Sequence, residues 1–407
     1  MFKSLSFITF FGLSTLLTAQ QSTTEYLTNV AIDFNEPELI PDSILQNHDL
    51  FFVGETHGFH DNYVIAWKMI QEFKRKTNFK YMLAEMDWAS SQKLNQALLQ
   101  QDTVALRKYM EKSKGSPAWC QERYELYKKI MRLNQESEMK IQYIGVDVPS
   151  GGIRLSLERI QAIREANHTS TDTLGAILNQ TKLNDSIIAL IGQLKLPASV
   201  ERYTERDLFE HNYHVQNILG YWEAANTSTQ NDWDRVRDSC QYENYKQLEK
   251  YYGLENEKML GIWGYVHTFQ KESERIKWFA SRLNEDLNKR IYSYRIFYFN
   301  SQCMLPASWV PGVIKFYRSP RKLYYSMDVQ NDDHWAGGKK EGAKDLKKVT
   351  AKKSITVFDL DRPESPYRHE PLLLLNYGTN WFTTAYFQSV IVVRHSDSTT
   401  PLGVNRK

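Results

Sequence analysis

Short apolar runs that alternate with long amphipathic stretches constrain the fold of this 407-residue chain more than any other feature. The first run, Leu50–Val53, is followed by helical periodicity over Asp61–Lys76. The second run, Tyr81–Ala84, precedes helical stretches that cover most of Ser90–Glu138. Strands separated by helices need crossover connections, which place the strands parallel to one another. The pattern therefore predicts a three-layer α/β fold with a mainly parallel central sheet.

Further apolar runs predict more strands and one large insertion. Ile141–Ile144 and Met259–Trp263 have the character of buried strands, and residues 151–257 between them are almost wholly helical in pattern. We expect this stretch to be a helical insertion over the C-terminal edge of the sheet, within one α/β domain that spans residues 20–407. Four later runs are candidates for extending the sheet: Ser293–Phe299, Leu323–Ser326, Ile355–Phe358 and Ser389–Val393.

The N-terminus has the pattern of a secretory signal peptide. Lys3 supplies a positive charge, an apolar run covers Leu5–Leu17, and the small residue Ala19 precedes a polar stretch. This run is shorter than the roughly 20 apolar residues that a membrane-spanning helix needs. We therefore expect residues 1–19 to be removed and the chain to be exported, periplasmic or secreted, without a membrane anchor.

Charge and cysteine content narrow the class of protein. Lys and Arg total 51 against 48 Asp and Glu, which gives a net charge of +3 and no support for nucleic-acid binding. The three cysteines, Cys120, Cys240 and Cys303, are too few for a disulfide framework. Stability is therefore expected to come from a large hydrophobic core.

Ionisable residues follow the first four predicted strands at the point where each strand ends. Ligands bind at this edge of open parallel sheets, so we expect these side chains to converge on one cleft. Each residue alone has a structural alternative, because an acid after a strand often caps a helix and a lone histidine is often part of the core. The converging residues are Glu55, His57, Glu85, Asp147 and His267, with Gly54, Gly58, Gly145 and Gly264 permitting tight turns beside them.

Two histidines among carboxylates suit two kinds of chemistry. A histidine oriented by a carboxylate can act as a general base on water, and the same side chains can also hold a metal ion. The chain lacks the HExxH, GxSxG, P-loop and GxGxxG motifs. Zincin, serine-hydrolase, phosphate-cradle and dinucleotide-binding functions therefore have no motif to support them.

A second polar cluster lies inside the predicted insertion. On a helix, Arg206, Glu210 and Tyr213 share one face, while Asp207 lies on another face with two histidines. An arginine over the cleft could bind a substrate carboxylate or stabilise an oxyanion. A solvated salt-bridge face is the alternative. His60, close to the first motif, is a further candidate for substrate binding.

These motifs, in this order, resemble the erythromycin esterase-like family, which belongs to a wider group with ChaN-type haem-binding proteins and Tiki-type proteases. The chain differs at two points: one residue separates Glu55 from His57 where the esterases usually have two, and His267 stands alone, with Tyr265 nearby, where they have two histidines. The matching segments are Gly54-Glu55-Thr56-His57-Gly58, Glu85, Gly145-Val146-Asp147, Arg206-Asp207 with Asn212, and Trp263-Gly264-Tyr265-Val266-His267.

The resemblance implies a metal-independent hydrolase that acts on an ester or lactone of a small molecule. His57 would be the general base, oriented by Glu55 or Glu85, and no cofactor would be needed. The alternatives from the wider group are a haem- or metal-binding protein of ChaN type and a metal-dependent peptidase of Tiki type. In the esterase interpretation, His267 and Arg206 would stabilise the oxyanion, and Asp147, Asp207, Tyr265 and His60 would bind substrate or support the site.

Overall fold

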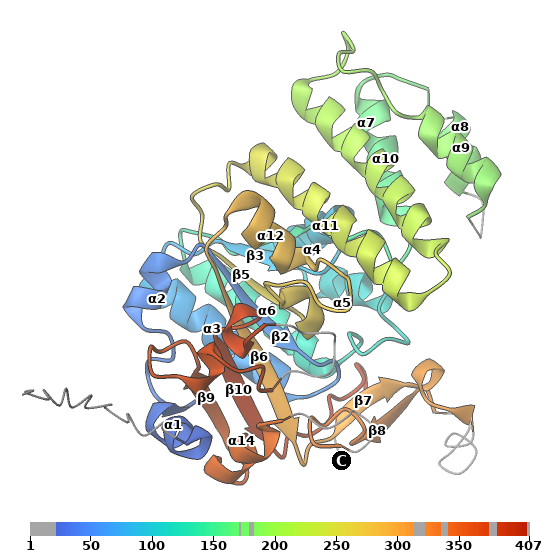
Figure 1. The fold of residues 1–407 in the computed structure, drawn as a ribbon. Helices are drawn as coiled ribbons and strands as arrows, with labels where there is room; N and C mark the ends of the chain where they lie inside the picture. The colour runs from blue at the N-terminus through green and yellow to red at the C-terminus, as the bar shows by residue number, and fades with distance from the viewer. Residues whose placement is uncertain are drawn as a thin grey trace, which may run out of the picture.

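An eight-stranded sheet forms the centre of the computed structural model (Figure 1). Its strands, in sheet order, are β1 (Ala31–Asp33), β9 (Ile355–Asp359), β10 (Ser389–Arg394), β6 (Ile291–Phe299), β2 (Leu50–Glu55), β5 (Met259–Gly264), β3 (Tyr81–Ala84) and β4 (Gln142–Gly145). The structure describes residues 22–170, 172–178, 183–312, 322–334, 341–373 and 381–404. The predicted signal peptide, residues 1–19, lies outside the described residues.

The sheet is mainly parallel, as the sequence predicts. Each neighbouring pair from β10 through β6, β2, β5 and β3 to β4 is parallel, and β9 is antiparallel to both of its neighbours. The four strands expected to deliver ionisable residues, β2, β5, β3 and β4, are adjacent in this order. Their carboxyl ends therefore meet at one edge of the sheet.

One expected extension of the sheet is wrong. The run Leu323–Ser326 contributes to β8 (Tyr324–Met327), which pairs with β7 (Cys303–Pro306) in a separate two-stranded antiparallel sheet. The chain leaves β6 with both sides of that strand already paired, to β10 and to β2. The β7–β8 hairpin therefore cannot join the sheet next to β6 and projects from it instead (Figure 1).

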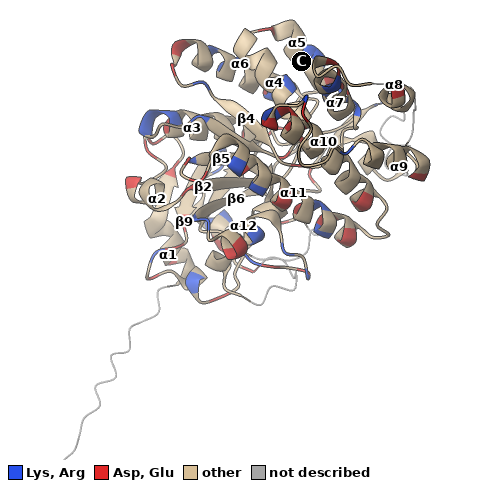
Figure 2. Ribbon diagram, turned by 90° about the horizontal axis from the view of Figure 1, so that it is seen from above, with Lys and Arg blue, Asp and Glu red and all other residues tan. Residues whose placement is uncertain are grey.

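Helices cover both faces of the sheet (Figure 2), which gives the three predicted layers. Alternate residues of β2 point to opposite sides: Phe51 and Val53 enter one core, and Leu50 and Phe52 enter another. The first face is covered by α3 (Asp61–Lys76) and α6 (Gln121–Glu136), and the second by α11 (Gln230–Tyr252) and α12 (Phe279–Leu287). Among the described residues, the other α-helices around the sheet are α1 (Thr23–Val30), α2 (Asp42–Asn47), α4 (Trp88–Gln100), α5 (Thr103–Glu111) and α14 (Ala343–Val349).

The elements that the described residues form between β4 and β5 are all helices, as expected for the insertion. Asn217 and Asn244 donate side-chain hydrogen bonds to the carbonyls of Asp147 and Val146, directly after β4. These bonds fix the two longest helices of the insertion at the C-terminal edge of the sheet. The insertion consists of α7 (Arg154–Ala166), α8 (Asp172–Leu178), α9 (Asp185–Gln193), α10 (Glu205–Ala225) and α11, with a small apolar core of its own.

Neither the charged residues nor the cysteines mark a particular region of the molecule. Basic and acidic residues are interspersed along the helices visible in Figure 2. The three cysteines are free thiols. Among the described helices, none combines the length and the hydrophobicity that crossing a membrane requires.

Candidate functional site

The turn after β2 depends on Gly58. This residue has a φ of +90°, and an added Cβ would lie 2.3 Å from the carbonyl oxygen of Met304. Its own carbonyl accepts hydrogen bonds from the backbone N–H groups of Met304 and Thr399, both at 2.9 Å. A side chain would therefore clash in a backbone conformation that already favours glycine. The resulting turn lets α3 start at Asp61, four residues after His57.

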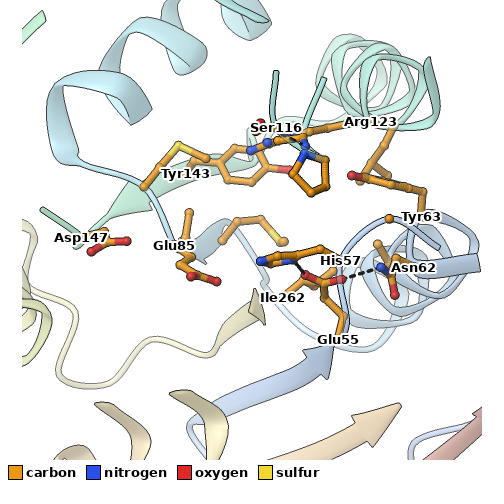
Figure 3. A pocket seen from close by; sticks show the side chains of 18 of the residues that line it. Glu55, His57, Asn62, Tyr63, Glu85, Ser116, Arg123, Tyr143, Asp147 and Ile262 are labelled. Atoms are coloured by element: carbon orange, nitrogen blue, oxygen red, sulfur yellow. Dashed lines mark hydrogen bonds and ion pairs between the residues drawn. The ribbon is translucent and has the colours of Figure 1, made fainter. Parts of the chain in front are cut away.

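Glu55 and His57 form a hydrogen-bonded pair at the end of β2. Glu55 Oε1 accepts from His57 Nδ1, and Glu55 Oε2 accepts from the side-chain amide of Asn62. The same amide donates to the carbonyl of Thr56 at 2.8 Å, which holds the carboxylate in place. Because Nδ1 faces Glu55, the other ring nitrogen of His57 is directed to the pocket, where the ring lies between Glu55 and Glu85 (Figure 3).

The charge of Glu55 changes the acidity of its partner. The nearby carboxylate raises the pKa of His57 from 6.5 to about 9, although burial acts in the opposite direction. The side chain of His57 is 44% exposed, whereas that of Glu55 is 11% exposed. The pair therefore combines a buried, oriented carboxylate with an accessible imidazole, which is an arrangement suited to proton transfer.

Arg237 connects the ends of β3 and β4. Its Nη2 donates to Glu85 at 2.7 Å, and its Nε donates to Asp147 at 3.0 Å. Glu85 also accepts from the backbone N–H of Gly264 at 2.8 Å. Burial raises the pKa of Glu85, but Arg237, His267, His57 and this N–H together outweigh burial and lower it to about 2. Glu85 is therefore a carboxylate at any physiological pH.

His267 lies behind Arg237, in the short 3₁₀ turn η1 (Tyr265–Thr268) that follows β5. Its Nδ1 is 2.8 Å from Asp238, a fully buried acid that also accepts from the backbone N–H of Phe279 at 2.6 Å. Burial lowers the pKa of His267, but Asp238 outweighs burial, so the pKa is raised overall. Nη1 of Arg237 lies 3.2 Å from Nε2 of His267 and can donate to it only while Nε2 is unprotonated.

A cavity of about 340 Å³ joins the Glu55–His57 pair to the Arg237 cluster. Of the five residues expected to converge, four line it directly, and His267 lies behind the wall, next to Arg237 and Glu85. The structure therefore brings four of these five side chains to one cavity. The other polar and aromatic residues of the wall include Asn62, Tyr63, Ser116, Arg123, Tyr127, Tyr143 and Trp309.

Arg206 does not lie over the cleft, contrary to the expectation from the sequence. Its side chain is 74% exposed, its Nε donates to Glu210 at 3.2 Å, and it is absent from the cavity wall. Asp207 likewise faces Asn167, whose amide donates to it at 3.3 Å. The physical reason is the packing of the insertion, which presents α11 rather than the start of α10 to the end of the sheet.

Two further candidates also lie outside the cavity wall. The ring of Tyr265 stacks on the guanidinium of Arg295, with 3.6 Å between the guanidinium carbon and the ring centroid. His60 lies 3.4 Å from a carboxylate oxygen of Glu122. Both residues support the segments that carry the site, and neither reaches the space in which a substrate would react.

Arg237, Asp238 and Asn62 belong to the site but are not predicted from the sequence. One signal for the first two was present, because Arg-Asp occurs twice in the insertion, at 206–207 and at 237–238. The resemblance points to the first copy, whereas the structure places the second copy at the site. No feature of the sequence distinguishes Asn62 from an ordinary polar residue in the first turn of a helix.

The carboxylates at this site are paired with basic side chains of the site. Glu85 and Asp147 are paired with Arg237, and Glu55 is paired with His57. Among the described residues, no group of three or more His, Cys, Asp or Glu side chains is arranged to hold a metal ion. The chemistry that these side chains themselves support is proton transfer and stabilisation of negative charge.

Comparison with known proteins places the fold. No protein-family profile and no curated protein sequence matches this chain. Among solved structures, a Bacillus cereus protein matches with a TM-score of 0.66 and 14% identity over 93% of this chain and 98% of its own. A succinoglycan biosynthesis protein matches with a TM-score of 0.60 and 12% identity over 94% and 98%. An erythromycin esterase, a variant of EreC in its open conformation, matches with a TM-score of 0.63 and 13% identity over 89% and 94%.

Proposed function

We propose that this protein, which has an erythromycin esterase-like fold, is a hydrolase that cleaves an ester bond with water activated by His57. The observation that carries the proposal is the Glu55–His57 pair, a buried carboxylate that orients an accessible imidazole at the wall of a cavity. The erythromycin esterase among the structural neighbours supports the same class of reaction.

In the proposed reaction, Nε2 of His57 takes a proton from water as the water oxygen attacks the ester carbonyl. Glu55 stabilises the imidazolium that forms and holds the ring in the tautomer with a proton on Nδ1. The carbonyl oxygen becomes an oxyanion in the tetrahedral intermediate. When the intermediate collapses, His57 returns the proton to the leaving alcohol, and the products are an alcohol and a carboxylic acid.

Arg237 is the residue best placed to stabilise the oxyanion. Its contacts with Glu85, Asp147 and His267 leave one N–H group of Nη1 for a ligand in the cavity. His267 and Asp238 would act through Arg237 by holding the guanidinium in position. This assignment moves the role expected of Arg206 to Arg237 and makes His267 a positioning residue.

A substitution at His57 tests the proposal. We expect His57→Ala to lower kcat on a responsive ester or lactone by roughly 10²–10⁴-fold, the usual contribution of a general base, without changing the circular dichroism spectrum. His60→Ala is the matched control, because His60 lies nearby but outside the cavity wall, and it should retain activity. A panel of chromogenic esters and lactones would supply the substrate.

Turnover that survives in His57→Ala would show that the proposed mechanism is wrong. The haem- and metal-binding alternatives have their own signatures, a Soret band after haem addition and stoichiometric metal in the purified protein. Either signature, together with turnover that a chelator abolishes, would replace the metal-independent mechanism.

We further propose that the protein is exported. The support is the signal-peptide pattern of residues 1–19. The mass of the protein recovered from the periplasm or the medium, compared with the full-length mass, would show whether the chain is processed near Ala19.

A further inference from the structure

The cavity wall opposite the Glu55–His57 pair carries a guanidinium without an acidic partner. Arg123, in the first turn of α6, donates through Nε to the hydroxyl of Tyr127 at 2.9 Å. Among the described residues, no carboxylate oxygen lies within 4.0 Å of its nitrogens, whereas Arg237 is paired with two carboxylates. A partly buried charge without a counter-ion is costly, and an anionic ligand would offset this cost.

Tyr143 adds to the same wall a hydroxyl that has no partner within the described part of the chain. This residue of β4 is 6% exposed and lines the cavity, and its backbone groups bond to Asn95. Within the part of the chain that the structure describes, its hydroxyl forms no hydrogen bond. Its ring packs against that of Tyr127, the hydrogen-bond partner of Arg123, with 5.7 Å between the ring centroids. In Figure 3 Tyr143 and Arg123 lie across the cavity from Glu55, with His57 between.

We propose that Arg123 and the Tyr143 hydroxyl bind a carboxylate of the substrate, so that the protein selects esters that also carry an acidic group. This inference rests on the proposed hydrolase function and adds the substrate class to it. A guanidinium presents parallel N–H donors that match the two oxygens of a carboxylate, and a phenol adds a third donor. One cation also balances the single charge of a carboxylate.

Binding of the anion orients the substrate. With its carboxylate at Arg123, a small ester extends across a cavity of about 340 Å³ toward His57 on the other side. The ester carbonyl then lies between the imidazole and the Arg237 cluster. The acidic group therefore contributes both to affinity and to positioning the reacting carbonyl.

The first experiment measures binding without turnover. The probe is 4-butyramidobenzoate, a benzoate whose amide resists hydrolysis, and binding is followed by calorimetry. We expect Arg123→Met to weaken binding by roughly 10–100-fold, the usual effect of losing a charge-assisted hydrogen-bonded pair. Arg132→Met, in an exposed position of the same helix, should bind like the wild type. Equal binding by all three proteins would overturn the proposal.

The second experiment measures selectivity in turnover. The substrates are 4-butyryloxybenzoate and its neutral methyl ester, methyl 4-butyryloxybenzoate. Cleavage of the butyrate ester releases a phenol from both. We expect the wild type to prefer the acid by roughly 10–100-fold in kcat/KM, mainly through KM. Arg123→Met should lose this preference, because its kcat/KM for the acid falls toward that for the neutral substrate. Tyr143→Phe should lose part of it.

The two experiments separate the inference from the hydrolase function. Binding that depends on Arg123 without any turnover would retain the anion site and remove the proposed function. Turnover without preference for the acid, unchanged in Arg123→Met, would retain the hydrolase and overturn the anion site. Tighter binding of 4-butyramidophenyl phosphate or sulfate than of the benzoate would overturn the assignment to a carboxylate.

Thermal stability provides the last check. Arg123→Met removes a partly buried charge that has no counter-ion, so Tm should stay the same or rise. A structural role for Arg123 would instead give a marked fall in Tm and weaker binding of every ligand. That result would overturn the proposal.

Discussion

At the residue scale, the site consists of two groups of ion pairs that differ in how accessible their basic side chain is. The Glu55–His57 pair has an accessible imidazole, while Arg237 is enclosed by Glu85 and Asp147. Groups with perturbed pKa values in a cleft are characteristic of functional sites. The first system is suited to moving a proton, and the second to presenting a fixed positive charge.

The pH dependence of turnover should report the Glu55–His57 pair. His57 has a pKa of about 9, so its base form increases as the pH rises, and kcat/KM should rise through about pH 9. Glu55→Gln removes the charge that raises the pKa of His57. The pKa of His57 should therefore fall toward 6.5, and the rising limb of the profile should move to lower pH. Stopped assays between pH 5 and pH 10 would measure both profiles.

The same assays on Glu136→Gln, which changes an exposed acid of α6, provide the control for that prediction. Its profile should match the wild type. A Glu55→Gln profile with an unmoved rising limb would mean that another group supplies the base.

Removal of Arg237 should cost stability as well as activity. Arg237→Met leaves the carboxylates of Glu85 and Asp147 in a buried place without their cation, which typically costs about 3–5 kcal/mol. Urea unfolding followed by tryptophan fluorescence would measure the loss. Arg206→Met, at the exposed arginine, should change the free energy of unfolding by less than about 0.5 kcal/mol. Equal losses would contradict the placement of the two arginines.

At the element scale, the turns after the strands determine where the site residues lie. The turn after β2 passes under the β7–β8 hairpin, where the N–H of Met304 bonds to Gly58. The backbone at the end of β4 packs equally closely against its neighbour, because a Cβ on Gly145 would lie 2.5 Å from the carbonyl oxygens of Met86 and Asp87. Both turns therefore need glycine, and both hold a candidate site residue nearby.

A methyl group at Gly58 should test this requirement. We expect Gly58→Ala to lower stability by at least about 1 kcal/mol, because its φ of +90° disfavours alanine and the added Cβ meets the Met304 carbonyl. Gly151→Ala is the matched control, since nothing lies within 4 Å of its added Cβ. Thermal unfolding would compare the two, and a Gly58 variant as stable as the Gly151 variant would contradict the description of the turn.

At the scale of the whole molecule, the helical insertion contains buried histidines that affect acid stability. His211 and His214 on α10 are fully buried, and both nitrogens of His214 lack hydrogen-bond partners among the described residues. The ring of His214 stacks on Trp88, with 5.2 Å between the ring centroids. Burial lowers the pKa of His211 to about 4 and that of His214 to about 3.

These lowered values predict a loss of stability in acid. Between about pH 6.5 and pH 3 the unfolded chain binds protons that the folded chain does not, so stability falls as the pH falls, by up to ~1.4 kcal/mol per pH unit for each histidine. His214→Phe keeps the ring against Trp88 and should flatten this dependence. Urea unfolding at several pH values would measure the slopes.

His369→Gln, at an exposed histidine, should leave the slope unchanged and serves as the control. Identical slopes for the wild type and His214→Phe would contradict a contribution from His214.

Much of the architecture was accessible from the sequence, because it depends on local patterns. The alternation of apolar runs and helical periodicity identified β2, β3, β4 and β5, and the helix expected over Asp61–Lys76 has these bounds in the structure. Parallel strands expose their carboxyl ends at one edge, so the residues that follow them had to meet. Glu55, His57, Glu85 and Asp147 were therefore brought together by a rule that needs no tertiary detail.

Only the tertiary structure decided which other side chains complete the site. Arg237 is 152 residues from Glu85 and 90 from Asp147 along the chain, and nothing local distinguishes it from Arg206. The packing of α10 and α11 on the end of the sheet selects one arginine and leaves the other in solvent. Arg123 and Tyr143 meet at the cavity because α6 packs against the sheet, with Tyr127 of α6 on the ring of Tyr143. Sequence patterns determine the faces of elements, and the relative placement of those elements determines which distant charges meet.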